Sequence, residues 1–168
     1  MAIKIDTSKI KKELEKRINE TLKNEAAKAI QQVERMHVYE DVYGAYGPPR
    51  IYGRRGESGG LADVNNMTIK PGDMEITVTN ETPFNNAYDF RGPLPFVPPP
   101  NYGNNLAMLI EKGNGGGGHI YNYPYPTAPG DFRPARPFIQ NTYKELMESS
   151  GLRMTIISGL RRRGIDAT

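Results

Sequence analysis

The stretch that decides the fold is NMTIKPGDMEITVTN, residues 66–80. Apolar and polar residues alternate on both sides of a turn sequence, Pro71-Gly72-Asp73. The alternating apolar residues are Met67, Ile69, Met74, Ile76 and Val78. A period of two is typical of a strand with one buried face, and Pro and Gly favour a tight turn. The stretch therefore predicts a β-hairpin, and we expect its apolar face to pack against the N-terminal helix.

That helix is predicted over residues 1–38. Apolar residues recur there at spacings of three and four, which places them on one stripe of a helix. They are Ile10, Leu14, Ile18, Leu22, Ala26, Ala29 or Ile30, Val33 and Met36. Lys and Glu occupy most other positions, and we interpret them as a solvated face. The stripe is narrow, which suits packing across a sheet or against a neighbouring subunit.

Two further helices are predicted over residues 138–163, one from Phe138 to about Ser149 and one from Leu152 to Arg163. Pro137 suits the first turn of the first helix because proline has no N–H to leave unpaired. Phe138 would then anchor this helix in the core. Two adjacent rows run along it, namely Phe138, Thr142 and Leu146 beside Ile139, Tyr143 and Met147. Gly164 is expected to be the C-cap of the last helix.

Glycine and proline are concentrated between these elements. The chain has 18 Gly and 14 Pro in 168 residues, well above their usual combined share of about 12%. They suggest two inserted loops, residues 82–105 and 114–130, and the prolines of the first argue against any regular strand there. We predict one α+β domain over residues 1–168. A long N-terminal helix packs on a small antiparallel sheet, C-terminal helices close the fold, and long Pro/Gly/Tyr-rich loops are inserted.

A short apolar run, Leu106 to Gly113, lies between the two loops. The pattern fits either a strand or a single helical turn. Glu111 ends the run, and we interpret it as the partner of an arginine in the segment Arg133–Arg136. A general-base role is less favoured, because no histidine or second carboxylate is placed to work with it.

Aromatic residues in the loops indicate an interface. The second loop has three tyrosines at alternate positions and no Lys or Arg among them, which favours a protein surface over base stacking. A tetraglycine tract precedes them, and long loops of this kind are usually functional or ordered on binding. The candidate interface residues are Tyr121, Tyr123, Tyr125, Phe90, Phe96, Phe132, Arg133, Arg136 and Glu111.

The sequence offers little chemistry for catalysis. It has no cysteine, and its two histidines, His37 and His119, have no spaced partners that suggest a metal or acid–base site. We therefore expect no enzyme, metal or cofactor. The net charge of +3 is too small to indicate nucleic-acid binding by itself. No apolar run approaches the ~20 residues of a membrane span, and we expect a chain made in the cytoplasm.

The order of short motifs resembles a known family. Arg54-Arg55 and Gly59-Gly60-Leu61 follow the long helix, and the hairpin ends in Val78-Thr79-Asn80. The apolar run and then Ala135-Arg136-Pro137-Phe138 precede the closing helix. This arrangement is similar to the tail-completion or head–tail joining (neck) proteins of tailed bacteriophages. Leu106 stands where that family usually has an aromatic residue in a strand, and both inserted loops are longer than usual.

The resemblance implies a non-enzymatic structural virion protein, assembled in the host bacterial cytoplasm. Its members form rings, commonly hexameric, in the neck. The implied partners are further copies of the chain, the connector or stopper, the tail terminator or tail tube, and passing genomic DNA bound without sequence specificity. The candidate DNA contacts are Arg54, Arg55, Arg161, Arg162 and Arg163.

Three other hypotheses stay open at this point. Within the structural class, the chain could be a tail terminator or a minor capsid protein. From other classes, it could be a nucleic-acid-binding module that uses its tyrosines and arginines, or an enzyme with a site around Glu111 and His119.

Overall fold

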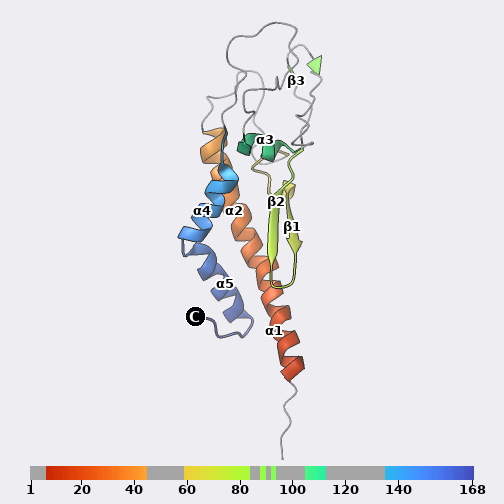
Figure 1. The fold of residues 1–168 in the computed structure, drawn as a ribbon, viewed down its shortest axis with the longest axis vertical. Coiled ribbons are helices and arrows are strands. Elements are labelled where there is room, and N and C mark those ends of the chain that lie inside the picture. The colour runs from red at the N-terminus through yellow and green to blue at the C-terminus, as the bar shows by residue number, and fades with distance from the viewer. Residues whose placement is uncertain (1–6, 45–58, 84–87, 90–91, 94–104, 113–134) are drawn as a thin grey trace, which may run out of the picture.

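The computed structural model describes residues 7–44, 59–83, 88–89, 92–93, 105–112 and 135–168. One long helix forms the spine of the molecule, and the other elements lie along it (Figure 1). Its segments are α1 (Thr7–Thr21), the π-helical η1 (Leu22–Ala26), α2 (Ala27–His37) and the π-helical η2 (Val38–Tyr43). The predicted helix is confirmed, but it continues to Tyr43 instead of ending at residue 38.

The π-helical segments change which side of the spine is buried. A π turn holds more residues than an α turn, so it rotates the residues before it relative to those after it. The buried row is Ala27, Gln31, Glu34 and Val38, with Ala26 beside it. The prediction that the apolar stripe forms a single packing face is therefore wrong. Ala26 is buried, the middle of the stripe is half-buried, and Ile10, Leu14 and Met36 are exposed.

The predicted hairpin is confirmed as strands β1 (Met67–Pro71) and β2 (Ile76–Asn80). They pair antiparallel, with Met67 opposite Asn80. These two residues are buried, whereas Ile69, Ile76 and Val78 are only partly covered.

The turn differs from the prediction. Pro71 still belongs to β1, and Gly72 N–H donates to Glu75 O across the turn at 2.9 Å. Met74 has a positive φ of 53° and is exposed, so it does not share the buried face as we expected. Its N–H donates to Asn19 Oδ1 at 2.9 Å, which ties the turn to α1.

The apolar run between the loops is the helix α3 (Leu106–Lys112), so the strand that the resemblance implies is wrong. Asn105 explains the choice, because its Oδ1 accepts from Met108 N–H at 3.0 Å in the manner of an N-cap. Leu106 N–H donates to Thr82 O at 2.9 Å, which fixes where the helix begins.

The first inserted loop holds a short ladder despite its prolines. Strands β3 (Tyr88–Asp89) and β4 (Gly92–Pro93) pair antiparallel. This corrects the expectation that residues 82–105 contain no strand. Each strand has only two residues, and Pro93 lies at the end of the ladder, where a missing N–H costs little.

The two C-terminal helices are confirmed as α4 (Phe138–Glu148) and α5 (Gly151–Arg162). Phe138 is fully buried in a small core near one end of the spine. The other core residues are Val38, Val42, Leu61, Ala62, Ala107 and Ile110. Gly164 has φ 75°, its N–H donates to Arg161 O, and Ile165 N–H donates to Leu160 O. This is the Schellman geometry expected of a C-cap glycine.

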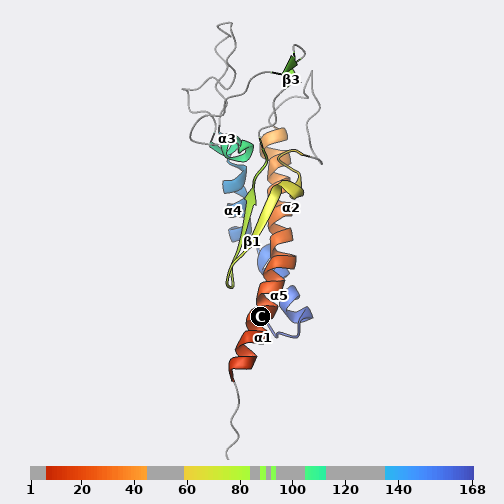
Figure 2. The same ribbon diagram turned by 90° about the vertical axis from the view of Figure 1, so that its right-hand side faces the viewer.

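α4 packs on α2, and α5 then crosses the spine near η1 and α1 (Figures 1 and 2). The crossing is close because α5 has Gly159 at this point. A Cβ on Gly159 would lie 2.6 Å from Thr21 Cγ2 and 3.0 Å from Glu25 Oε2. Arg163 Nη1 locks the crossing by donating to Glu25 Oε1 at 2.8 Å.

We expect Gly159→Ala to destabilise the fold by about 1–3 kcal/mol, because the added methyl group overpacks the crossing. Urea denaturation followed by circular dichroism measures the change. Gly151→Ala is the matched control in the same helix, since its nearest atom would be Ser149 Oγ at 3.6 Å. The control should be neutral or slightly stabilising. Equal stability of the two variants would contradict a tight crossing at Gly159.

Candidate interaction surface

A buried polar cluster joins the spine, the hairpin and α3. Asn80 is its centre, since its Nδ2 donates to Glu34 Oε1 at 2.8 Å and to Leu61 O at 2.9 Å. Its Oδ1 accepts from Thr82 Oγ1 at 2.6 Å. Its backbone oxygen accepts from Asn105 Nδ2 at 3.1 Å. The side chain is therefore fully satisfied, as a buried amide must be to avoid a desolvation penalty.

A second polar contact lies on the same face of the spine. Gln31 Nε2 donates to Met67 O at 2.9 Å, at the start of the hairpin. Sequence reasoning missed both Gln31 and Glu34, because polar residues on a helix are ordinarily placed on the solvated side.

Glu34 is the buried ionisable group of this cluster. Burial raises the pKa of its carboxyl above the ordinary 4.5, the hydrogen bond from Asn80 lowers it, and the nearby Glu111 raises it. The net direction is upward. A raised pKa means that the folded state holds this proton more tightly than the unfolded chain does.

The protonated Glu34 carboxyl therefore favours folding at pH below 4.5, and this contribution is lost as the pH rises through the raised pKa. Glutamine does not ionise, so Glu34→Gln should not lose stability in this way. We expect the unfolding free energy of the variant to rise relative to that of the natural chain from about pH 4 to pH 8. Urea denaturation across this range measures it.

Glu25→Gln is the matched control with the opposite sign. Burial by itself raises the pKa of Glu25. Hydrogen bonds from Arg163 and Arg162 lower this pKa, and the net direction is downward. Glu25→Gln should therefore be destabilising at neutral pH, and the penalty should shrink as the carboxyl protonates below 4.5. Parallel pH profiles for Glu34→Gln and the natural chain would contradict this account.

Glu111 lies at the junction of α3 and α4. Its Oε2 accepts from Ile139 N–H at 2.8 Å and its Oε1 from Gln140 N–H at 3.1 Å. These are N–H groups of the first turn of α4, which have no partner inside the helix. Glu111 thus caps α4 from another element. The ion pair expected between Glu111 and an arginine of the segment Arg133–Arg136 stays a prediction. The backbone of Arg136 does lie beside the end of α3, since its N–H donates to Ile110 O at 2.9 Å.

We expect Glu111→Ala to cost about 0.5–2 kcal/mol of stability, the usual effect of removing a helix N-cap. Thermal denaturation monitored by circular dichroism measures it. Glu148→Ala removes a carboxylate from the other end of α4, where it only faces Lys144 at 4.0 Å on the surface. That control should change little. An unchanged melting temperature for Glu111→Ala would contradict the capping role.

His37 couples the spine to α4. Its Nδ1 is 3.0 Å from Asp41 Oδ2, and its Nε2 is 2.9 Å from Glu145 Oε2. Asn141 Nδ2 also donates to Asp41 Oδ2 at 2.9 Å. The fold thus gives His37 two acidic partners that the sequence analysis did not identify, Asp41 from η2 and Glu145 from α4. Among the described residues, no group of three or more His, Asp or Glu side chains has the geometry to hold a metal ion.

The basic residues at the end of α5 have structural contacts. Arg163 binds Glu25 and donates to Gly159 O at 3.0 Å. Arg162 Nη2 is 3.3 Å from Glu25 Oε1, and Arg161 Nε donates to Ala167 O at 3.0 Å. Arg163 is half-buried by these contacts, whereas Arg161 and Arg162 remain exposed. These contacts favour a structural role for the arginines at the C-terminus of α5 over a role in binding DNA.

Most of the predicted interface residues lie outside the described part of the chain. These are Tyr121, Tyr123, Tyr125, Phe90, Phe96, Phe132 and Arg133. The candidate DNA contacts Arg54 and Arg55 lie outside it as well, as does His119. The structure therefore brings together only Glu111 and Arg136 from the predicted interface set.

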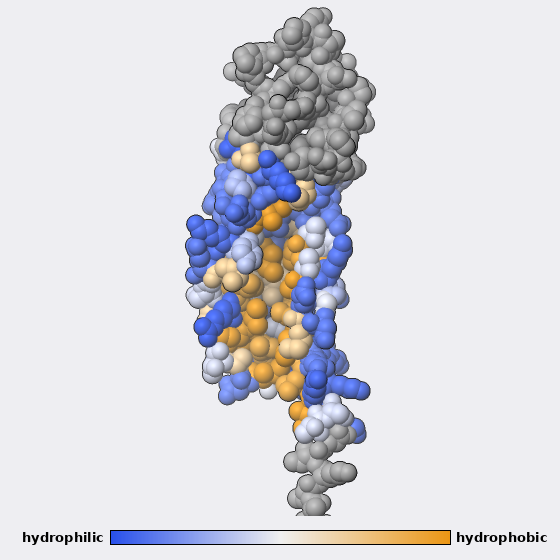
Figure 3. Space-filling model, in the orientation of Figure 1, coloured by the Kyte–Doolittle hydropathy of each residue, from blue (hydrophilic) through white to orange (hydrophobic). Residues whose placement is uncertain are grey.

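A different surface stands out in the described residues. Hydrophobic side chains form a continuous face between α4 and α5 on one side and the hairpin on the other (Figure 3). Tyr143 and Met147 of α4 are 65% and 67% exposed, unusually high values for large apolar side chains. They belong to the second of the two rows on the first C-terminal helix. That row was the available sign of exposed apolar side chains on α4, because one helix–helix contact buries only one row.

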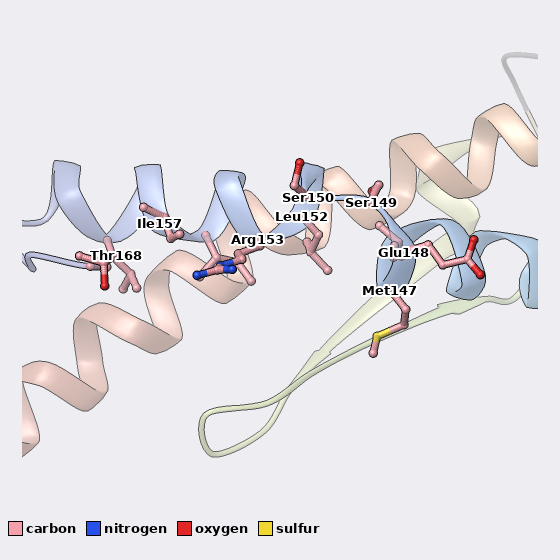
Figure 4. A pocket seen from close by; sticks show the side chains of 12 residues that line it. Met147, Glu148, Ser149, Ser150, Leu152, Arg153, Ile157 and Thr168 are labelled. Atoms are coloured by element: carbon pink, nitrogen blue, oxygen red, sulfur yellow. The ribbon is translucent and has the colours of Figure 1, made fainter.

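A pocket opens beside the turn between α4 and α5 (Figure 4). Its volume is about 620 Å³. Its apolar lining consists of Leu146, Met147, Leu152, Ile156, Ile157 and Leu160. The last residues of the chain, Ala167 and Thr168, border it. A hollow with this lining can accept apolar side chains from a partner.

Taken together, these features define an α+β protein with a helical spine, a small core at one end and an open hydrophobic face along its length. The chain belongs to the YomN family, whose model matches residues 6–162. No curated protein and no solved structure matches the chain. Within the described residues, none of the helices has the length and apolar character needed to cross a membrane.

Proposed function

We propose that this protein is a structural virion component of a tailed bacteriophage. It forms a ring, hexameric in keeping with the resemblance, in the neck, where it completes the tail and joins it to the head connector. The observation that carries the proposal is the open hydrophobic face between α4–α5 and the hairpin. A single subunit leaves this face in water, and contiguous exposed apolar surface of this kind marks protein–protein contact.

The order of elements supports the same proposal. A long helix, a hairpin and a closing helix after Pro137 follow one another as in the neck proteins that the sequence resembles, and this chain adds α5. α3 departs from that outline because it is a helix where a strand is usual. The support therefore comes from the spine, the hairpin and the C-terminal pair.

The energetics also favour assembly. The core cluster is small, and the hairpin has only two strands, too few for independent stability without packing on another element. Burying the open face between subunits would add apolar burial at about 25 cal/mol per Å². Two different neighbours in a ring can cover two different surfaces of each copy.

DNA contact would be a secondary property of such a ring. Among the candidates, Arg162 and Arg163 both bind Glu25, and Arg163 is half-buried. The candidates Arg54, Arg55, Arg161, Arg162 and Arg163 would meet phosphates without reading bases.

Cryo-electron microscopy of purified particles of the phage that encodes this chain tests the proposal. We expect a ring of copies between the head connector and the tail tube, with the spine helix visible in each copy. Absence of the protein from purified particles would overturn the proposal. A ring at the end of the tail tube would instead indicate a tail terminator, and a position on the capsid would indicate a minor capsid protein.

A further inference from the structure

The first turns of α1 extend beyond the rest of the molecule (Figures 1 and 2). We name residues 7–16 the arm. Residues 7–14 are all exposed, including Ile10 at 53% and Leu14 at 42%. These two residues are four apart and lie on the stripe that continues to Ile18 and Leu22, which are half-buried. The arm therefore carries the outer, uncovered end of an apolar stripe.

An arm of this kind is expected to have a partner. The arm is the end of a long helix, and helices in proteins are stabilised chiefly by packing of their apolar face, which residues 7–14 lack within one chain. The charged residues of the arm do not supply that packing. The ion pairs Lys11–Glu15 and Glu13–Arg17 are exposed i,i+4 pairs, which contribute only about 0.3–0.5 kcal/mol each.

The α4–α5 pocket is the complementary surface on the same chain. Apolar anchors spaced by four residues on a helix are the usual way in which a helix occupies a hydrophobic groove. Ile10 and Leu14 provide such anchors, and Leu146, Met147, Leu152 and Ile156 provide the groove.

The arm of a given chain is directed away from its own pocket. Arg17 Nη1 donates to Arg163 O at 2.6 Å, which holds the spine against the end of α5 just after the arm. Arg163 also binds Glu25 further along the spine. The arm continues the helix past these contacts, beyond the end of α5 (Figures 1 and 2). A pocket on another copy is thus the surface that it can reach.

Charges of both signs can pair at this contact. The arm has four lysines and two glutamates, α4 has one lysine and two glutamates, and α5 has three arginines. Glu148 borders the pocket with a side chain that is 68% exposed, and Arg153 lines the α5 side. Lysines of the arm can pair with Glu148 and its glutamates with Arg153, and such pairs on opposite sides of the pocket would set the orientation of the arm.

We propose that the arm of one copy docks into the α4–α5 pocket of a second copy of this chain, with Ile10 and Leu14 as its anchors. The two surfaces differ, so the contact is heterologous and repeats from copy to copy, which closes into a ring when the rotation permits. The inference rests on the proposed function in that it supplies the contact between neighbours in the neck ring.

The first test is association of the purified full chain. Leu14→Gln should weaken self-association by roughly ten- to a hundredfold, the effect of losing one buried leucine side chain. Ser8→Gln is the matched control, because it places the same residue on the opposite side of the arm and leaves the charge of the arm unchanged. Analytical ultracentrifugation measures both. Since Leu14 is exposed in the single chain, circular dichroism should show both variants folded. Unchanged association of Leu14→Gln would overturn the proposal.

The second test uses the absence of cysteine from the chain. Protein with Leu14→Cys is mixed with protein with Met147→Cys under mild oxidation. We expect a disulfide-linked pair that contains one chain of each kind. Lys12→Cys with Met147→Cys is the control and should give little product. Equal yields from the two mixtures would overturn the docking of the arm in the pocket.

The two proposals can fail separately. If the protein lies in a neck ring but Leu14→Gln assembles normally, the docking is wrong and the function stands. If the arm and pocket cross-link between copies but the protein is absent from the particle, the docking stands and the function is wrong.

Discussion

The structure depends on one buried amide, the side chain of Asn80. It binds the spine through Glu34, the loop before the hairpin through Leu61, and the residue after the hairpin through Thr82. Its backbone oxygen accepts a hydrogen bond from Asn105 Nδ2, and the Asn105 side chain also caps the start of α3. A fully satisfied polar cluster of this kind gives one arrangement of the elements a clear advantage, because any shift leaves a buried group unpaired.

This cluster lies near one end of the spine, and the closed core lies next to it. Further along, α5 meets the spine at Gly159 while the hairpin reaches it at Asn19, so the helices and the hairpin stay apart. The hydrophobic face between them remains open (Figure 3). The molecule thus has a frame that leaves apolar surface open within a single chain, and the proposed assembly rests on this open face.

Local patterns predicted much of the frame. The alternation in residues 66–80 predicted the hairpin, and Pro137 and Gly164 predicted where the C-terminal helices begin and end. Other features depend on contacts between distant residues. The capping of α4 by Glu111 joins side chain and backbone across a sequence separation of 28. The helix α3 depends on Asn105 and on Thr82, so the run Leu106 to Lys112 did not by itself distinguish a strand from a helix.

The sequence by itself determined that the chain has a long amphipathic helix, a hairpin and two closing helices, because periodicity, prolines and glycines act over a few residues. Only the tertiary structure decided which side of the spine is buried. Two π-helical segments rotate its faces, and the backbone oxygens and Asn80 of the hairpin require polar partners, which Gln31 and Glu34 provide. Apolar residues that periodicity assigns to a core are thereby left on the surface, where Ile10 and Leu14 are exposed.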